Sequence, residues 1–269
     1  MKISIGQIAV TPDKATNLES ICSAVEAASK SGASLIVFPE FAMLFDMANL
    51  GAGLLAAEAI PGEFTRAIDN LARKFGIAIA VGMHEAVGDR LRAYNTVYVT
   101  SSAGNEIAKY HKVHLMEAFG LRESDNIIPS PDPDAVVFRY GELCFGIITC
   151  YDVRFPESAR ALVDVGVDVI LLPSFWATGP QKLDHWTTLI RARAIENTAY
   201  VVASNSSAPG SFGTSMIVDP SGEVLASLGE APETRTVDIF KGRVDEVRQQ
   251  NPSLANRRFR VMRIQSTSK

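Results

Sequence analysis

Cysteine is scarce in this sequence, and its scarcity bears on where the protein works. Only three cysteines occur among 269 residues, Cys22, Cys144 and Cys150, and no two of them form a C-x-x-C motif. An odd number of cysteines without a paired pattern predicts reduced thiols, as in a cytoplasmic protein. The first residues, Met1–Gly6, also lack the apolar core of a secretory signal.

Long apolar runs and an excess of basic charge are absent as well. No stretch of the sequence reaches the ~18 apolar residues that would span a bilayer, so we expect no membrane contact. The net charge is −4, from 26 basic and 30 acidic residues, and this balance gives no reason to expect a nucleic-acid partner.

Cofactor motifs are missing too. The sequence has no zinc-ligand spacing, no phosphate-binding glycine loop and no dinucleotide fingerprint. His111 and His114 are three residues apart, and such positions on an extended segment point to opposite faces, which disfavours one shared metal ion. We therefore expect neither a cofactor nor a metal.

The composition is that of a soluble globular protein, with 47% hydrophobic and 21% charged residues. No internal repeat and no Gly/Ser/Pro-rich linker divides the chain. The sequence therefore predicts one domain over residues 1–269, ending in a C-terminal tail from about residue 250.

Short apolar or alternating runs are interleaved with helical periodicity. Strands are predicted over residues 2–8, 34–38, 77–82, 94–100, 107–110, 145–149, 167–172, 200–204, 215–218, 223–227 and 234–238. Helices are predicted over residues 17–31, 63–75, 156–165, 182–197 and 241–250. Strands that are apolar on both faces need cover on both sides, so the pattern predicts a layered α/β fold without choosing between one sheet and two.

Three polar residues follow predicted strands: Glu40, Lys112 and Cys150. Strand ends in α/β sheets are where ligands bind, so these side chains are candidates for one site. Each also has an ordinary structural alternative. Cys150 could be a packing residue, as we expect for Cys144 and Cys22; Glu40 could cap or pair on a loop, and Lys112 could be a surface lysine.

Together the three residues make a coherent chemistry. A free thiol is only a few per cent ionised at neutral pH, so a neighbouring Glu40 would take its proton as Cys150 attacks. The ammonium of Lys112 would stabilise the thiolate and then the oxyanion of a tetrahedral intermediate. Cys150 also stands between a strand and a helix that begins at Pro156, so the Tyr151 amide could point at that oxyanion, as in a nucleophile elbow.

Five segments carry a resemblance to a known family. They resemble, in order and over most of the chain, the signature blocks of the nitrilase superfamily, and within it the Nit-type amidases. These segments are Val37–Glu40, Tyr110–Leu115, Ile148–Glu157, Arg191–Asn197 and Gly213–Gly222.

The resemblance implies a four-layer α-β-β-α sandwich and a Glu-Lys-Cys catalytic set. Glu40 would then be the general base, Cys150 the nucleophile, and Lys112 the oxyanion stabiliser together with the Tyr151 amide. It also implies a second glutamate, for which Glu123 is the best match, with Glu117 as a rival nearer to Lys112. Members usually pair through outer helices, so a homodimer or larger homo-oligomer is expected.

The implied activity is hydrolysis of a linear amide, such as the ω-amide of a carboxylate-bearing substrate, through a Cys acyl-enzyme. An N-carbamoyl compound or a nitrile would use the same residues, and a binding protein that kept the fold is a further alternative. Arg154 could clamp a substrate carboxylate, or could instead pair with Asp152 or Glu157. Residues Gln181–Asp184 exceed the usual family spacing and are expected to form a loop near the substrate entrance.

Overall fold

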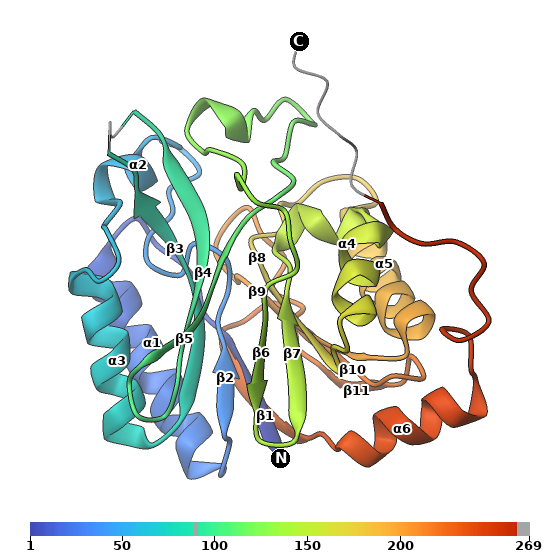
Figure 1. The fold of residues 1–269 in the computed structure, drawn as a ribbon. Coiled ribbons are helices and arrows are strands. Elements are labelled where there is room, and N and C mark those ends of the chain that lie inside the picture. Colours follow the sequence, from blue (N-terminus) through green and yellow to red (C-terminus); the bar gives the residue numbers. More distant parts are fainter. Residues whose placement is uncertain (89–90, 263–269) are drawn as a thin grey trace.

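The computed structural model describes residues 1–88 and 91–262, which form two six-stranded sheets packed face to face (Figure 1). In spatial order the first sheet contains β12 (Glu233–Asp238), β1 (Lys2–Gln7), β2 (Leu35–Val37), β3 (Ala78–Ala86), β4 (Ala93–Thr100) and β5 (Glu106–His111). The second contains β11 (Val224–Ser227), β10 (Met216–Val218), β9 (Tyr200–Asn205), β8 (Val169–Ser174), β7 (Leu143–Ile147) and β6 (Val137–Tyr140).

Strand alternation explains why both faces of each sheet are covered. Leu35 and Val37 of β2 point into the core between the sheets, whereas Ile36 points to the outer face and joins a second apolar cluster. In the other sheet, Val169 and Leu171 of β8 meet the same central core, and Ile170 lies in a third cluster. Because all of these side chains are fully buried, each sheet needs a helical layer outside it.

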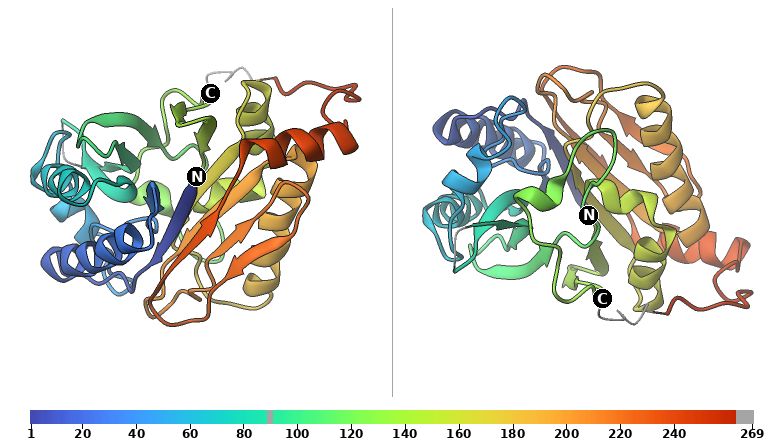
Figure 2. Two further views of the ribbon diagram at one scale, coloured as in Figure 1. Left: turned by 90° about the horizontal axis from the view of Figure 1, so that it is seen from below. Right: turned by 90° about the horizontal axis from the view of Figure 1, so that it is seen from above.

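Four helices supply those outer layers, which Figure 2 shows from above and below. Helices α1 (Lys14–Lys30) and α3 (Glu63–Phe75) pack on the first sheet, and α4 (Pro156–Asp164) and α5 (Lys182–Asn197) pack on the second. Two further helices are α2 (Ala52–Ala56) and α6 (Lys241–Gln250), and short 3₁₀ turns occupy Glu123–Asp125 and Cys150–Arg154. The predicted four-layer sandwich is confirmed.

The parallel strands place the polar residues together. In each sheet three neighbouring strands run parallel, β1-β2-β3 in one and β7-β8-β9 in the other. Glu40 follows β2, Cys150 follows β7 and Phe175 follows β8, while Lys112 directly follows β5. The carboxyl ends of these strands face one region between the two sheets, where the site forms.

Helices with strong local signals lie where they were predicted. The bounds of α3, α5 and α6 agree with the sequence analysis. Helix α1 starts three residues earlier than predicted, because Asp13 caps it and its Oδ1 accepts the Thr16 N–H at 2.7 Å. The sequence analysis missed α2 and β6, both short.

Two predictions of local structure are wrong. Strand β3 continues four residues beyond Gly82, because it pairs with β4 along its whole length, from Ile79 opposite Thr100 to Ala86 opposite Ala93. Residues Gln181–Asp184 do not form a loop: Gln181 caps α5, and the following three residues make its first turn.

The described part of the C-terminal region, residues 251–262, contains no helix or strand. It is fastened to the body by an ion pair between Arg257 and Asp164 of α4. The rest of the predicted C-terminal tail, residues 263–269, lies outside the described residues. Among the helices that the structure describes, none combines the length and apolar character needed to cross a membrane.

Candidate active site

Glu40 is a buried carboxylate whose two oxygens are both held. Its Oε1 accepts hydrogen bonds from Lys112 Nζ at 2.9 Å and from Asn95 Nδ2 at 2.7 Å. Its Oε2 accepts the backbone N–H of Phe175 at 2.8 Å. Because three donors from three separate segments converge on it, the side chain is fixed in one orientation rather than free to rotate.

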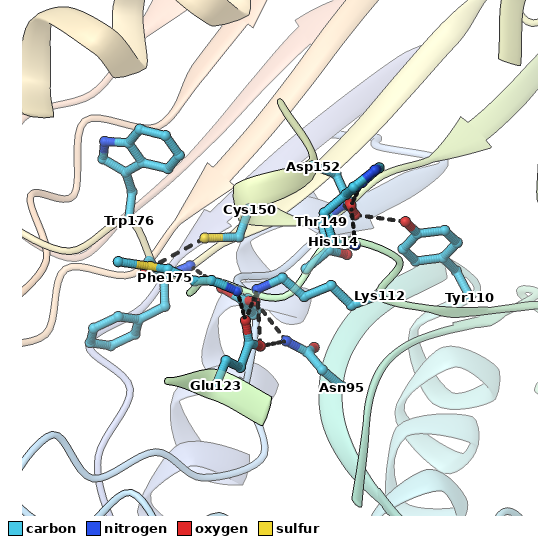
Figure 3. Close-up of polar contacts among 12 residues, drawn as sticks. Asn95, Tyr110, Lys112, His114, Glu123, Thr149, Cys150, Asp152, Phe175 and Trp176 are labelled. Atoms are coloured by element: carbon cyan, nitrogen blue, oxygen red, sulfur yellow. Dashed lines mark hydrogen bonds and ion pairs between the residues drawn. The ribbon is translucent and has the colours of Figure 1, made fainter. Parts of the chain in front are cut away.

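Lys112 is equally buried, and it contacts a second glutamate. Its side chain is 2% exposed, and its Nζ lies 3.0 and 2.8 Å from Glu123 Oε1 and Oε2 (Figure 3). Burial opposes the charged form of Lys112, but the nearby carboxylates of Glu123 and Glu40 outweigh it and hold the lysine pKa well above its usual range. Lys112 is therefore a charged, paired group and not a surface lysine.

The structure distinguishes between the two candidate second glutamates. Glu123 Oε2 accepts hydrogen bonds from both Lys112 and the Met116 N–H, the latter at 2.8 Å. Glu117 turns away, and its Oε1 caps the Ser124 N–H at 2.9 Å. The 3₁₀ turn at Glu123–Asp125 carries the glutamate towards the lysine, whereas the proximity of Glu117 in sequence is no guide to its direction.

Cys150 occupies a strained position at the start of a tight turn. Its φ is 47°, in the left-handed region that non-glycine residues rarely adopt. The turn Cys150–Arg154 leads into α4, whose first residue is Pro156. This sharp change from strand to helix matches the predicted elbow and carries the thiol out of the sheet, where Sγ lies 3.7 Å from the Phe175 carbonyl oxygen.

The surroundings of Cys150 favour the protonated thiol over the thiolate. Burial raises its pKa well above the usual range, the Glu40 carboxylate raises it further, and Lys112 acts in the opposite direction. Attack by this sulfur consequently requires a base at hand during the reaction, rather than a standing thiolate.

Asp152 ties the Cys150 turn to the segment that carries Lys112. Its carboxylate is fully buried and accepts four hydrogen bonds. Oδ2 receives the Thr149 N–H at 2.9 Å and the Tyr110 hydroxyl at 2.6 Å, and Oδ1 receives the His114 N–H at 2.9 Å and contacts His114 Nδ1 at 2.8 Å (Figure 3).

One glycine makes room for the base. A Cβ on Gly82 of β3 would lie 2.6 Å from the Phe41 nitrogen, 2.7 Å from the Glu40 Cα and 2.7 Å from the Pro39 oxygen. Backbone atoms cannot yield at such distances, so only glycine lets the Glu40 segment cross β3 this closely.

A pocket opens beside Glu40, Lys112 and Cys150, and most of its wall is apolar. Its other lining residues are Phe41, Phe45, Met47, Leu50, His84, Met116, Leu121, Arg122, Glu123, Asn126, Ile127, Phe175 and Ala177. Apolar walls around a few convergent polar groups are typical of small-molecule sites.

Arg154 has neither of the ion-pair partners considered for it. Within the described ranges no ion pair joins it to Asp152 or Glu157; its Nη2 lies 3.4 Å from His185 Nδ1, and its Nε is buried without a hydrogen-bond partner. The guanidinium carbon lies 4.7 Å from the Trp176 ring centroid. Tyr151, whose amide was the other predicted substrate contact, packs its ring edge-on to Phe155.

The two histidines near Lys112 serve separate carboxylates. His111 Nε2 lies 2.7 Å from Glu85 Oε2, and His114 contacts Asp152. They point to different partners, as their spacing predicted. Across residues 1–88 and 91–262, no cluster of three or more His, Cys, Asp or Glu side chains is arranged to hold a metal ion.

Sequence reasoning missed three contributors to the site. Asn95 bridges Glu40 and Glu123 through its Nδ2, at 2.7 and 3.1 Å. Phe175 contributes its backbone N–H to Glu40 and its carbonyl oxygen to the Cys150 contact, and Asp152 acts through the turn that it braces. Asn95, a polar residue within the apolar β4, was the one available signal, since buried amides need partners.

Comparison with known proteins agrees with this geometry. Residues 2–249 match the family described as carbon-nitrogen hydrolase. The chain is 34% identical to deaminated glutathione amidase of Escherichia coli O157:H7, over 96% of this chain and 98% of that protein. It is 33% identical to the Bos taurus protein of the same name, over 95% of this chain and 81% of that one.

Solved structures give the same result. The Caenorhabditis elegans NitFhit protein superposes with a TM-score of 0.86 at 30% identity, over 96% of this chain and 65% of that one. A mutant of the Nesterenkonia AN1 amidase, from the nitrilase superfamily, superposes with a TM-score of 0.81 at 26% identity, over 95% of both chains. The chain belongs to the carbon–nitrogen hydrolase family of the nitrilase superfamily.

Proposed function

We propose that this enzyme hydrolyses a linear amide through an acyl-enzyme on Cys150, with Glu40 as general base and Lys112 as oxyanion stabiliser. The observation that carries the proposal is the convergence of a buried thiol, a carboxylate fixed by its hydrogen bonds and a lysine paired with that carboxylate at the strand ends. A binding protein would have no use for this combination, since each buried ionisable group has a desolvation cost.

The first half of the reaction makes a thioester. Glu40 removes the Cys150 proton as Sγ attacks the amide carbon, and the carbonyl oxygen becomes an oxyanion near the Lys112 ammonium and the Tyr151 amide. Glu40 then returns the proton to the amide nitrogen, the C–N bond breaks and the amine leaves, as ammonia where the substrate is a primary amide. The carboxylate is suited to both steps, because Asn95 and Phe175 hold it in place while it gains and loses the proton.

The second half restores the enzyme. A water molecule gives a proton to Glu40 and attacks the thioester carbon; the C–S bond then breaks, and the proton returns to Sγ. Glu123 stays beside Lys112 throughout, so the lysine remains charged and positioned.

The substrate that we favour is an ω-amide that carries a carboxylate. Support comes from Arg154, whose guanidinium lacks a carboxylate partner among the described residues and has one buried N–H without an acceptor. It comes also from relatives whose names give deaminated glutathione as their substrate.

The test is hydrolysis by the purified protein. The panel contains deaminated glutathione, α-ketoglutaramate, butyramide, an N-carbamoyl amino acid and a nitrile, with Cys150→Ala as the control. Hydrolysis is followed as ammonia release for α-ketoglutaramate, butyramide, the carbamoyl compound and the nitrile, and as cysteinylglycine release for deaminated glutathione, whose amide nitrogen belongs to cysteine. Release from the two carboxylate-bearing amides, abolished in the control, is the expected result. Release from the carbamoyl compound or nitrile alone would reject the amide assignment, and no release at all would favour a binding role.

Arg154→Lys tests the substrate class separately. A lysine cannot reproduce the bidentate fork, so KM for the carboxylate-bearing amides should rise about 10-fold or more. An equal loss for butyramide would show that Arg154 has a structural role instead.

A cytoplasmic location and a homodimeric state belong to the same proposal. All three cysteines are free, as expected in a reducing compartment. Light scattering of the purified protein at several concentrations tests the second point, and a mass of one chain, 29.0 kDa, would reject it.

A further inference from the structure

Lys182 is a buried lysine for which the described residues provide no counter-ion. It is the first residue of α5 and is 5% exposed. The other buried lysine, Lys112, touches two carboxylates, but no ion pair or side-chain hydrogen bond involves Lys182 within the described parts of the chain. Its Nζ lies instead 3.9 Å from the Phe119 ring centroid and 5.3 Å from that of Trp176.

A second cation shares the same aromatic rings. The Arg154 guanidinium carbon lies 4.7 Å from the Trp176 centroid and 6.0 Å from the Phe119 centroid. Burial lowers the pKa of Lys182, and the positive charge of Arg154 lowers it further. Two like charges held this close are unfavourable unless an anion joins them, and cation–π contact offsets only part of that cost.

Local backbone contacts fix the pair beside the reacting sulfur. Trp176 Nε1 donates to the Lys182 carbonyl at 2.8 Å, which holds the start of α5 against the indole. The preceding Gln181 reaches this position with a φ of 59°. Trp176 itself follows Phe175, whose carbonyl oxygen contacts Cys150 Sγ, and Figure 3 shows the indole on the side of the thiol.

Both cations lie around the Trp176 ring, and Trp176 directly follows Phe175, whose carbonyl oxygen contacts Cys150 Sγ. A negative charge on Cys150 would raise the pKa of Lys182, which agrees with this placement. An ammonium has three N–H donors, and a guanidinium has a planar fork of donors that matches a carboxylate.

We propose that Lys182 and Arg154 together bind a single carboxylate at the far end of the acyl group. The inference rests on the proposed function and deepens it, by making Lys182 a second specificity-determining residue. Residues Gln181–Asp184, which exceed the usual family spacing, were expected to form a loop at the substrate entrance. In this proposal they instead form the cap and first turn of α5, and Lys182 in that turn binds the substrate.

The test compares two amides of equal chain length. Succinamate carries a terminal carboxylate, and butyramide has a methyl group in its place. In Lys182→Met, which keeps an unbranched side chain against the rings, KM for succinamate should rise about 10-fold or more, and kcat/KM for butyramide should change by no more than about threefold. Lys182→Arg should retain most of the succinamate activity.

A matched control is available in Lys74, an exposed lysine whose Nζ lies 4.8 Å from the Phe75 centroid, remote from the site. Lys74→Met removes the same kind of contact and should leave both amides unaffected. Equal losses for succinamate and butyramide in Lys182→Met, or no loss for either, would overturn the proposal.

A binding measurement separates this inference from the proposed reaction. Succinate, titrated calorimetrically into the Cys150→Ala protein, should bind, and adding Lys182→Met should weaken Kd about 10-fold or more. Absence of succinate binding, or equal binding in both proteins, would reject the carboxylate subsite even if amides are hydrolysed. Binding that depends on Lys182 in a protein without amide turnover would retain the subsite and reject the proposed function.

Discussion

Replacing Asp152 by asparagine should damage the site without touching any group that we place in the reaction. The side chain keeps its size, but one carboxylate oxygen becomes an NH₂ donor. At present all four hydrogen-bonding contacts of this fully buried carboxylate are with potential donors: the Thr149 and His114 N–H groups, the Tyr110 hydroxyl and His114 Nδ1.

The cost can be worked out from the two possible orientations of the amide. If the NH₂ group takes the Oδ2 place, the Tyr110 hydroxyl can rotate to accept from it, but the Thr149 N–H loses its partner. If it takes the Oδ1 place, His114 Nδ1 can change tautomer, but the His114 N–H loses its partner. In either orientation one backbone N–H is left without an acceptor, and the remaining hydrogen bonds are no longer made to a charged group. Together these losses should lower the free energy of unfolding by about 2–4 kcal/mol.

Urea unfolding and steady-state kinetics measure the two consequences. We expect Asp152→Asn to lose about 2–4 kcal/mol of unfolding free energy and about 10- to 100-fold in kcat, because the Cys150 turn is no longer fixed against the Lys112 segment. Asp245→Asn, the same exchange at a side chain 59% exposed, should cost less than about 1 kcal/mol. A midpoint and a kcat like those of the wild type in Asp152→Asn would refute the reasoning.

Three further predictions concern the base, its support and a buried imidazole. Glu40→Gln should lower kcat about 10²- to 10⁴-fold with little change in the unfolding midpoint, and near-normal turnover would exclude Glu40 as the base. Gly82→Ala should lower both stability and activity, because its Cβ would meet the backbone of Pro39 and Phe41; unchanged circular dichroism melting would contradict this. Burial lowers the pKa of His84 from 6.5 to about 4, so the unfolded chain takes up a proton first as pH falls. The free energy of unfolding should therefore drop by about 2 kcal/mol between about pH 7 and pH 5. His84→Phe should remove this pH dependence, and its persistence in that variant would show that another group is responsible.

Local patterns were sufficient for much of the framework. Apolar periodicity predicted α3, α5 and α6 with their observed bounds, and Gly76 marked the end of α3, because helix formation and termination depend on residues within one or two turns. The short β2 and β8 were recognisable because strands buried on both faces must be continuously apolar. The positions of Glu40, Lys112 and Cys150 just beyond strands were also readable from sequence.

The contacts between side chains of distant segments could not be predicted from local patterns. Glu123 rather than Glu117 reaches Lys112, because a 3₁₀ turn sets its direction, and Asn95 joins two glutamates that are 83 positions apart in the sequence. The hydrogen-bond partners of a buried charge come from strand ends that sheet packing brings together. These strand ends are far apart in the sequence, so no single segment predicts the partners.

Lys182 shows the same limit most clearly. Two interpretations of its surroundings came from the sequence, the start of a helix and a loop near the substrate entrance, and neither indicates that the ammonium lies between Phe119 and Trp176 beside Arg154. Short-range periodicity and turn chemistry predicted the helices, the strands and the three polar residues at strand ends, and the family resemblance supplied the two-sheet sandwich and Glu123 as the best match for the second glutamate. The contacts between Glu123 and Lys112 and the pairing of the two cations came from the three-dimensional packing, because they join segments that are distant in the sequence.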